Sequence, residues 1–197
     1  MQTLYDLPAP AKINLFLHIT GRRADGYHLM QSAFVLLDLH DTLHLCLRTD
    51  GQVSREDLQS PHASEALPHD DLSVKAAKLL KQATGSACGV HITLQKRIPS
   101  QAGMGGGSSD AATVLLALNR LWNTHLSRTD LMRLGLQLGA DVPFFLFGDN
   151  AWAEGIGEQL QPLDWSPQRY LVVKPPQGLP TAAIFSDPNL KRDTKAA

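Results

Sequence analysis

The sequence predicts an α+β fold, in which antiparallel strands form a sheet that packs against helices. Residues near the N-terminus alternate between apolar and polar side chains, and later segments combine helical periodicity with capping residues. No internal repeat is present. Hairpins followed by helices are typical of the α+β class, and 197 residues are enough to bury about 70% of the unfolded surface.

The first quarter of the chain predicts a hairpin and one further strand. Apolar residues alternate with other residues over 12–19, which indicates a strand with one face in the core. A charged turn at 21–26 then leads to a returning apolar segment at 30–39. Alternation at 42–47 predicts another half-buried strand, and the polar stretch 50–71 predicts a surface loop.

Capping residues and apolar periodicity predict three helices. They span residues 72–83, about 109–123 and 127–139. Asp70 or Asp71 can cap the first helix, which Gly85 ends. Ser127 begins a capping pattern for the third.

The last third of the chain predicts short strands. The apolar run 144–147 is interpreted as a buried strand, and 152–160 as a hairpin that turns at Gly155 and Gly157. Residues 170–174 predict one more strand before consecutive prolines force irregular chain.

A glycine- and serine-rich run, residues 99–110, lies between the strand-like segment 90–94 and the apolar helix that follows. Glycines let backbone N–H groups approach an anion, and a helix N-terminus offers unpaired N–H groups and partial positive charge. The run therefore predicts a site for a nucleotide or another phosphate ester. The residues expected to form it are Pro99, Ser100, Gln101, Ala102, Gly103, Met104, Gly105, Gly106, Gly107, Ser108 and Ser109.

Other interpretations of this run fit less well. A flexible linker is disfavoured because both flanking segments have the apolar character of buried structure. A Walker A loop would need a lysine after its last glycine, where Ser108 stands. A dinucleotide fingerprint would need an acidic residue closing the next strand, but Asp130 belongs to a predicted helix start. A different type of ATP loop remains.

Bulk properties exclude several classes of partner. The net charge of −1 gives no electrostatic footprint for nucleic acid or an anionic membrane. Cys46 and Cys88 lack metal-type and redox-type spacing, so we interpret both as reduced and structural. The N-terminus lacks a signal-peptide pattern, and no run of about 18 apolar residues occurs. We therefore expect a cytoplasmic protein.

Several segments together resemble the GHMP kinase superfamily. The segments that carry this resemblance are 9–15, 99–112 and 139–143. The sequences Gly26-Tyr27-His28 and 180–185 narrow it to the kinases of 4-diphosphocytidyl-2-C-methyl-D-erythritol. The similarity extends over residues 7–194.

The resemblance implies a small-molecule kinase that uses ATP and Mg²⁺ to phosphorylate the tertiary 2-hydroxyl of this substrate, in the non-mevalonate isoprenoid pathway. Residues 1–174 would form the ATP-binding and catalytic N-terminal domain. Residues 175–197 would begin a ferredoxin-like α/β domain that is mostly absent from the chain. The expected partners are the substrate and ATP, without nucleic acid or membrane; neither metal ligands nor an oligomeric state is assigned.

The resemblance assigns the chemistry to Lys12 and Asp141. Asp141 would orient the acceptor hydroxyl or take its proton, and Lys12 would keep Asp141 ionised and offset developing negative charge. Composition alone favours a turn aspartate and a solvated strand lysine instead. Asn14 shares a face with Lys12 and is expected to contact substrate. Ser109 is a candidate contact for the metal or a phosphate oxygen.

Tyr27, His28 and Phe185 resemble the residues with which the family binds cytosine. Aromatic faces would stack on the base and His28 would hydrogen-bond its edge, although Phe185 is also compatible with a core position. A site built for a base edge can reject substrates without the partner groups by about 10⁴-fold. His28 would then carry specificity more than rate.

Two alternatives stay open at this point. The chain is compatible with a catalytically incomplete nucleotide-binding fragment, which would expose apolar surface where the second domain is missing. It is also compatible with another GHMP kinase acting on an alcohol such as mevalonate or homoserine, which the Gly-Tyr-His segment disfavours.

Overall fold

A computed structural model describes the chain except for residues 1, 59–66, 176–177 and 179–180. Its strands are β1 (Thr3–Arg22), β2 (His28–Arg48), β3 (Val53–Asp57), β4 (Gly89–Gln95), β5 (Ala151–Glu154) and β6 (Gln159–Pro162). Its helices are α1 (Leu72–Thr84), α2 (Gly106–Leu121), α3 (Arg128–Leu136), α4 (Val142–Phe147) and α5 (Thr181–Ser186). This is the α+β fold that the sequence predicts.

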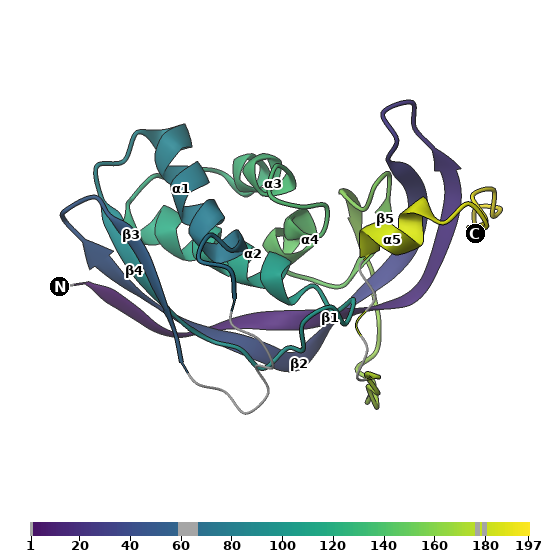
Figure 1. Cartoon of the computed structure of the whole chain (residues 1–197), viewed down its shortest axis with the longest axis horizontal. Coiled ribbons are helices and arrows are strands. Elements are labelled where there is room, and N and C mark those ends of the chain that lie inside the picture. Colours follow the sequence, from purple (N-terminus) through teal and green to yellow (C-terminus); the bar gives the residue numbers. More distant parts are fainter. Residues whose placement is uncertain (1, 59–66, 176–177, 179–180) are drawn as a thin grey trace.

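The sheet is organised around the long antiparallel hairpin of β1 and β2 (Figure 1). The other edge of β2 pairs with β4 along its C-terminal half and with β5 nearer its N-terminal end. β3 is parallel to β4, and β6 is antiparallel to β5. Irregularities in the β1–β2 register accompany a curved hairpin, whose tip rises beside α5 (Figure 1).

Helices α1 to α4 cover one face of the sheet, and the core lies between these two layers (Figure 1). Leu43, Leu45 and Ile92 from the sheet are fully buried there. Phe34 of β2 packs edge-on against Phe144 of α4, with ring centroids 5.1 Å apart. The packing fixes α2, and hence the glycine loop before it, against the middle of the sheet.

The predicted helix boundaries follow the capping chemistry. Asp71 accepts a hydrogen bond from the Val74 amide at the start of α1, and Gly85 ends the helix in the left-handed conformation. Ser127 caps α3 in the same way as Asp71 caps α1. These two starts are confirmed, whereas α2 begins at Gly106, within the glycine run and earlier than expected.

Four strand and loop predictions are wrong in whole or in part. Residues 144–147 are helical, because Pro143 suits the first turn of a helix and Gly148 supplies a left-handed end. Residues 30–39 and 42–47 are strand, as predicted, but they form one continuous strand, β2, rather than two. The polar stretch 50–71 contains β3, and part of it lies outside the described residues.

The fourth is the strand expected at 170–174, which is irregular in the structure. Leu171 and Val173 there are 92% and 79% exposed. The segment is rich in residues that favour strands, but it pairs with no strand among the described residues. Such residues form a strand only where a neighbouring strand and packing partners are present. The hairpin at 152–160, by contrast, is confirmed as β5 and β6.

Candidate functional site

The glycine loop requires glycine at its junction with α2. Gly105 stands at the N-cap with φ of 70°, in the region that side chains other than glycine rarely adopt. A Cβ atom there would lie 2.7 Å from the ring of Phe145 and 3.3 Å from Cγ of Lys12. One residue on, a Cβ atom on Gly106 would lie 3.1 Å from Ile98. The loop thus lies directly on β1 and α4.

A cavity of about 500 Å³ opens beside this loop. Every predicted loop residue from Pro99 to Ser108 lines it, together with Asp141. Ser109 does not line it but is buried behind it, where its hydroxyl oxygen has no hydrogen-bond partner in the described structure. An orphaned hydroxyl at a helix start is suited to a phosphate oxygen or a metal ion bound to it.

Asp141, which lines this cavity, forms an ion pair with Lys12. The Lys12 ammonium lies 3.5 Å from the Asp141 carboxylate, and its side chain is 6% exposed against 36% for Asp141. The backbone N–H of Lys12 also donates to the Met104 carbonyl at 3.0 Å. Lys12 therefore contributes its ammonium to the pair with Asp141 and its backbone N–H to the attachment of the glycine loop to β1.

Asn14 connects this pair to the next strand. Its amide oxygen accepts a hydrogen bond from Lys12 Nζ at 2.6 Å, and its amide nitrogen donates to the Ser32 hydroxyl at 3.1 Å. The Lys12 ammonium also lies 4.7 Å from the Phe34 ring centroid, a cation–π contact. With so many neighbours the ammonium is held in place before any ligand binds.

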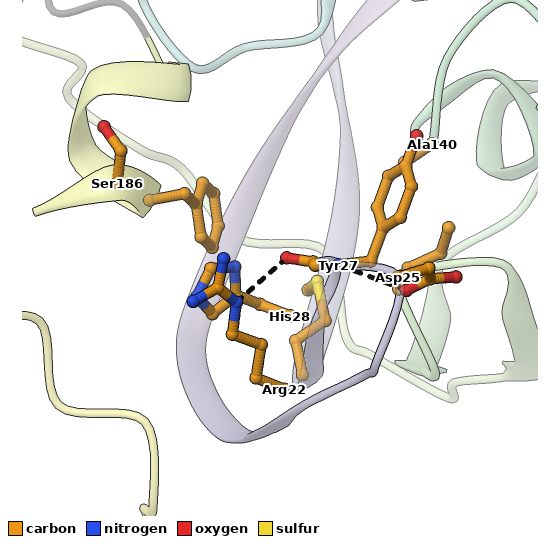
Figure 2. A pocket seen from close by; sticks show the side chains of 10 residues that line it. Arg22, Asp25, Tyr27, His28, Ala140 and Ser186 are labelled. Carbon is orange, nitrogen blue, oxygen red and sulfur yellow. Dashed lines mark hydrogen bonds between the residues drawn. The ribbon is translucent and has the colours of Figure 1, made fainter.

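Tyr27, His28 and Phe185 lie around a second cavity, of about 470 Å³ (Figure 2). The first two come from the end of the β1–β2 hairpin and the third from α5. The rings of His28 and Phe185 are 5.1 Å apart, while Tyr27 is 57% exposed. The structure thus brings the three predicted base-binding residues to one cavity, and Phe185 lies at its edge rather than in the core.

Sequence reasoning missed Arg192, which joins the two sides of this cavity. Its Nε donates to His28 Nε2 at 2.9 Å, and its terminal nitrogens donate to the carbonyls of Leu190, Phe185 and Asp187. Partial burial lowers the pKa of His28, and the charges of Arg192 and Arg22 lower it further. A neutral His28 accepts this bond, and nothing in the local sequence signals the contact.

A buried charge cluster beside the glycine loop was also missed. Lys96 forms ion pairs with Asp41 and Asp110, the second at 2.7 Å. The Asp41 and Asp110 side chains are 0% and 1% exposed. Burial raises the pKa of Asp110 to about 7 despite its lysine partner. The available signal was a charged residue, Asp110, directly before the apolar run of α2.

Comparisons with known proteins identify the family of the chain. The model of the GHMP kinases N terminal domain matches residues 71–149. A 4-diphosphocytidyl-2-C-methyl-D-erythritol kinase of Delftia acidovorans is 64% identical over 98% of this chain and 67% of its own. A relative of the same name from a Polaromonas species is 63% identical over the whole chain and 65% of its own.

A solved structure of a kinase of the same family also matches the fold. A crystal structure of a 4-(cytidine 5'-diphospho)-2C-methyl-D-erythritol kinase matches with a TM-score of 0.71 at 40% identity, over 93% of this chain and 63% of that one. The chain spans about two thirds of the length of the curated relatives it matches. Among the described residues, no helix is long and apolar enough to cross a membrane.

The fold and the glycine loop define the class, that of the GHMP kinases. Within it, the chain belongs to the family of 4-diphosphocytidyl-2-C-methyl-D-erythritol kinases.

Proposed function

We propose that this chain carries the ATP-binding and catalytic part of a kinase that phosphorylates the 2-hydroxyl of 4-diphosphocytidyl-2-C-methyl-D-erythritol, a step of isoprenoid biosynthesis in the cytoplasm. The observation that carries the proposal is the Lys12–Asp141 pair at the glycine-loop cavity. The family's relatives carry this activity in their names. Residues 1–174 are taken as the N-terminal domain, and 175–197 as the start of the second.

Asp141 is proposed to orient the acceptor hydroxyl and to accept its proton. Phosphoryl transfer depends on positioning and on stabilising charge rather than on covalent chemistry by the protein. The carboxylate is accessible at 36% exposure, and the buried ammonium beside it offsets negative charge that builds up on the transferred group. The same ammonium donates a hydrogen bond to Asn14, which helps to hold it in place.

The glycine loop is proposed to hold the ATP phosphates through backbone N–H groups at the start of α2. Mg²⁺, when bound with ATP, neutralises charge on the phosphates. Among the described residues no group of three or more His, Cys, Asp or Glu could hold a metal ion. The fit therefore rests on the phosphates themselves and on the unpartnered Ser109 hydroxyl.

His28, Tyr27 and Phe185 are proposed to bind the cytosine of the substrate. The cavity they line has the volume of a small-molecule site, and its mixture of aromatic rings and one imidazole suits a base that stacks and hydrogen-bonds. A different alcohol substrate without a base would leave this cavity without an occupant, which is why the cytidyl compound is preferred.

The test is ATP consumption with Mg²⁺ and the cytidyl substrate, by wild type and by Asp141→Asn. Loss of the base is expected to lower turnover by about 10²–10⁴-fold, while the dissociation constant of ATP changes little. The variant also controls for contaminating kinases. Equal turnover by the two proteins would exclude the role given to Asp141.

A second candidate is a nucleotide-binding unit that needs more protein for turnover. The nearly complete exposure of Leu171 and Val173 favours it, because apolar side chains of this size in one segment are typical of an uncovered interface. ATP binding without turnover by a folded wild-type chain would support this candidate. Turnover by a monodisperse monomer would exclude it.

A further inference from the structure

The cluster of Asp41, Lys96 and Asp110 joins three elements around the glycine loop. Asp41 lies in β2, Lys96 directly follows β4, and Asp110 lies in the first turns of α2. One oxygen of Asp41 accepts the backbone N–H groups of Arg97 and Ile98, at 2.5 and 2.8 Å. The other oxygen accepts a hydrogen bond from the Lys96 ammonium. The chain entering the loop is therefore fixed to the sheet.

The same ammonium fixes the chain that leaves the loop. Lys96 Nζ donates to one oxygen of Asp110 at 2.7 Å. The ammonium also lies close to Gly106, the first residue of α2. A Cβ atom added to Gly106 would be 3.3 Å from Lys96 Nζ. Lys96 and Asp110 both line the glycine-loop cavity. One side chain thus connects both ends of the loop at the floor of the cavity.

We propose that Lys96 is a positioning residue for nucleotide binding: by joining Asp41 to Asp110 it holds the two ends of the glycine loop in register, so that the loop amides converge on the phosphates. The proposal rests on the proposed function, because it assumes that ATP occupies this cavity. Burying a charge costs free energy unless the charge is paired. Here the paired charges adjoin the glycine loop, whose backbone N–H groups would contact the phosphates directly.

Asp110 is less completely paired than Asp41. One of its carboxylate oxygens is buried and has no hydrogen-bond partner in the described structure. Burial raises its pKa to about 7; Lys96 lowers it, and Asp41 and Asp71 raise it. Asp71 is itself paired with Arg55. The ion pair with Lys96 is therefore the contact that compensates the buried charge of Asp110.

The first measurement is the dissociation constant of ATP for the 197-residue chain, by isothermal titration calorimetry. Lys96→Met is expected to weaken binding by about tenfold to a hundredfold, since a misplacement of about 1 Å can have an effect of this size. Lys96→Arg, which keeps the charge, should restore much of the affinity. The matched control is Lys191→Met, because Lys191 is an exposed lysine that does not line this cavity.

A second variant decides the question if Lys96→Met does not fold. Asp110→Asn removes the carboxylate that Lys96 contacts in α2 but keeps the size of the side chain, and it is expected to weaken ATP binding by about threefold to tenfold. Asp130→Asn is the matched control, because Asp130 is a partly exposed residue of α3 that does not line the cavity. Equal affinities of Asp110→Asn and wild type would contradict the positioning role.

The outcomes separate the two proposals. If wild type binds no ATP at any pH, the proposed function fails and this inference fails with it. If wild type binds ATP, but folded Lys96→Met or Asp110→Asn binds it equally well, only the positioning role is overturned.

Discussion

The two cavities of this molecule are built in opposite ways. The glycine-loop cavity is formed mainly by one continuous segment, 98–108, whose backbone is held by buried side chains beneath it. The second cavity, the proposed base site, is formed mainly by partly or largely exposed residues of the hairpin tip and α5, together with Ala140 and Ile156. Its His28–Arg192 bond joins residues 164 positions apart. We infer that the first cannot be altered without disturbing the fold, whereas the second can.

The largest effect is expected from Gly105→Ala. The substitution both strains a residue with φ of 70° and drives a methyl group into the Phe145 ring, so it should cost about 1–3 kcal/mol of unfolding free energy and weaken ATP binding. Gly103→Ala is the matched control, because Gly103 has nearly the same φ, 69°, but nothing within 4 Å of the added atom. Equal losses in thermal melts of the two variants would contradict the argument from packing.

A smaller and more selective effect is expected from His28→Ala. Loss of the imidazole should raise KM for the cytidyl substrate by about tenfold to a hundredfold and leave ATP affinity nearly unchanged. Steady-state kinetics with each substrate varied would measure this. His40→Ala is the control, because His40 is partly exposed and bonds only locally, to the Asp38 carbonyl. A parallel loss of ATP affinity would show that the two cavities are not independent.

Arg192→Ala should weaken the same cavity indirectly. It removes the bonds that hold the end of α5 to His28, so KM for the cytidyl substrate should rise by about threefold to tenfold with kcat unchanged. The neighbouring Lys191→Ala, at an exposed position, should have no effect. A fall in kcat at constant KM would contradict a role in building the cavity.

The smallest effect is a pH dependence of stability. Because the folded-state pKa of His28 is lowered, its contribution is present above the unfolded value of 6.5 and is lost as the pH falls through the lower folded value. The difference in melting temperature between wild type and His28→Ala should therefore shrink on acidification. A difference that does not change from about pH 7.5 to pH 5 would remove the assignment of a neutral His28.

The contrast between the cavities also explains which features the sequence predicts. The glycine loop, the Asp71 and Ser127 caps and the β1–β2 hairpin are encoded by neighbouring residues, and local patterns identify them. Residues 144–147 are a short apolar run whose periodicity does not distinguish a buried strand from a helix. Arg192 and the Asp41–Lys96–Asp110 cluster depend on tertiary contacts between distant segments, and no local pattern in a single sequence identifies the partners in such contacts.

The long hairpin of β1 and β2 sets the distance between the two cavities. It carries Lys12 near its middle and His28 at its tip, so the number of residues between them fixes how far apart these two side chains lie. A strand advances about 3.4 Å per residue and alternates faces, so loss of a two-residue pair from both strands would shorten this distance by about 7 Å and keep each side chain on its face. On the proposed function, the length of the acceptor that fits would change in steps of two residues, whereas loss of a single residue would place the side chains of the tip on the opposite face.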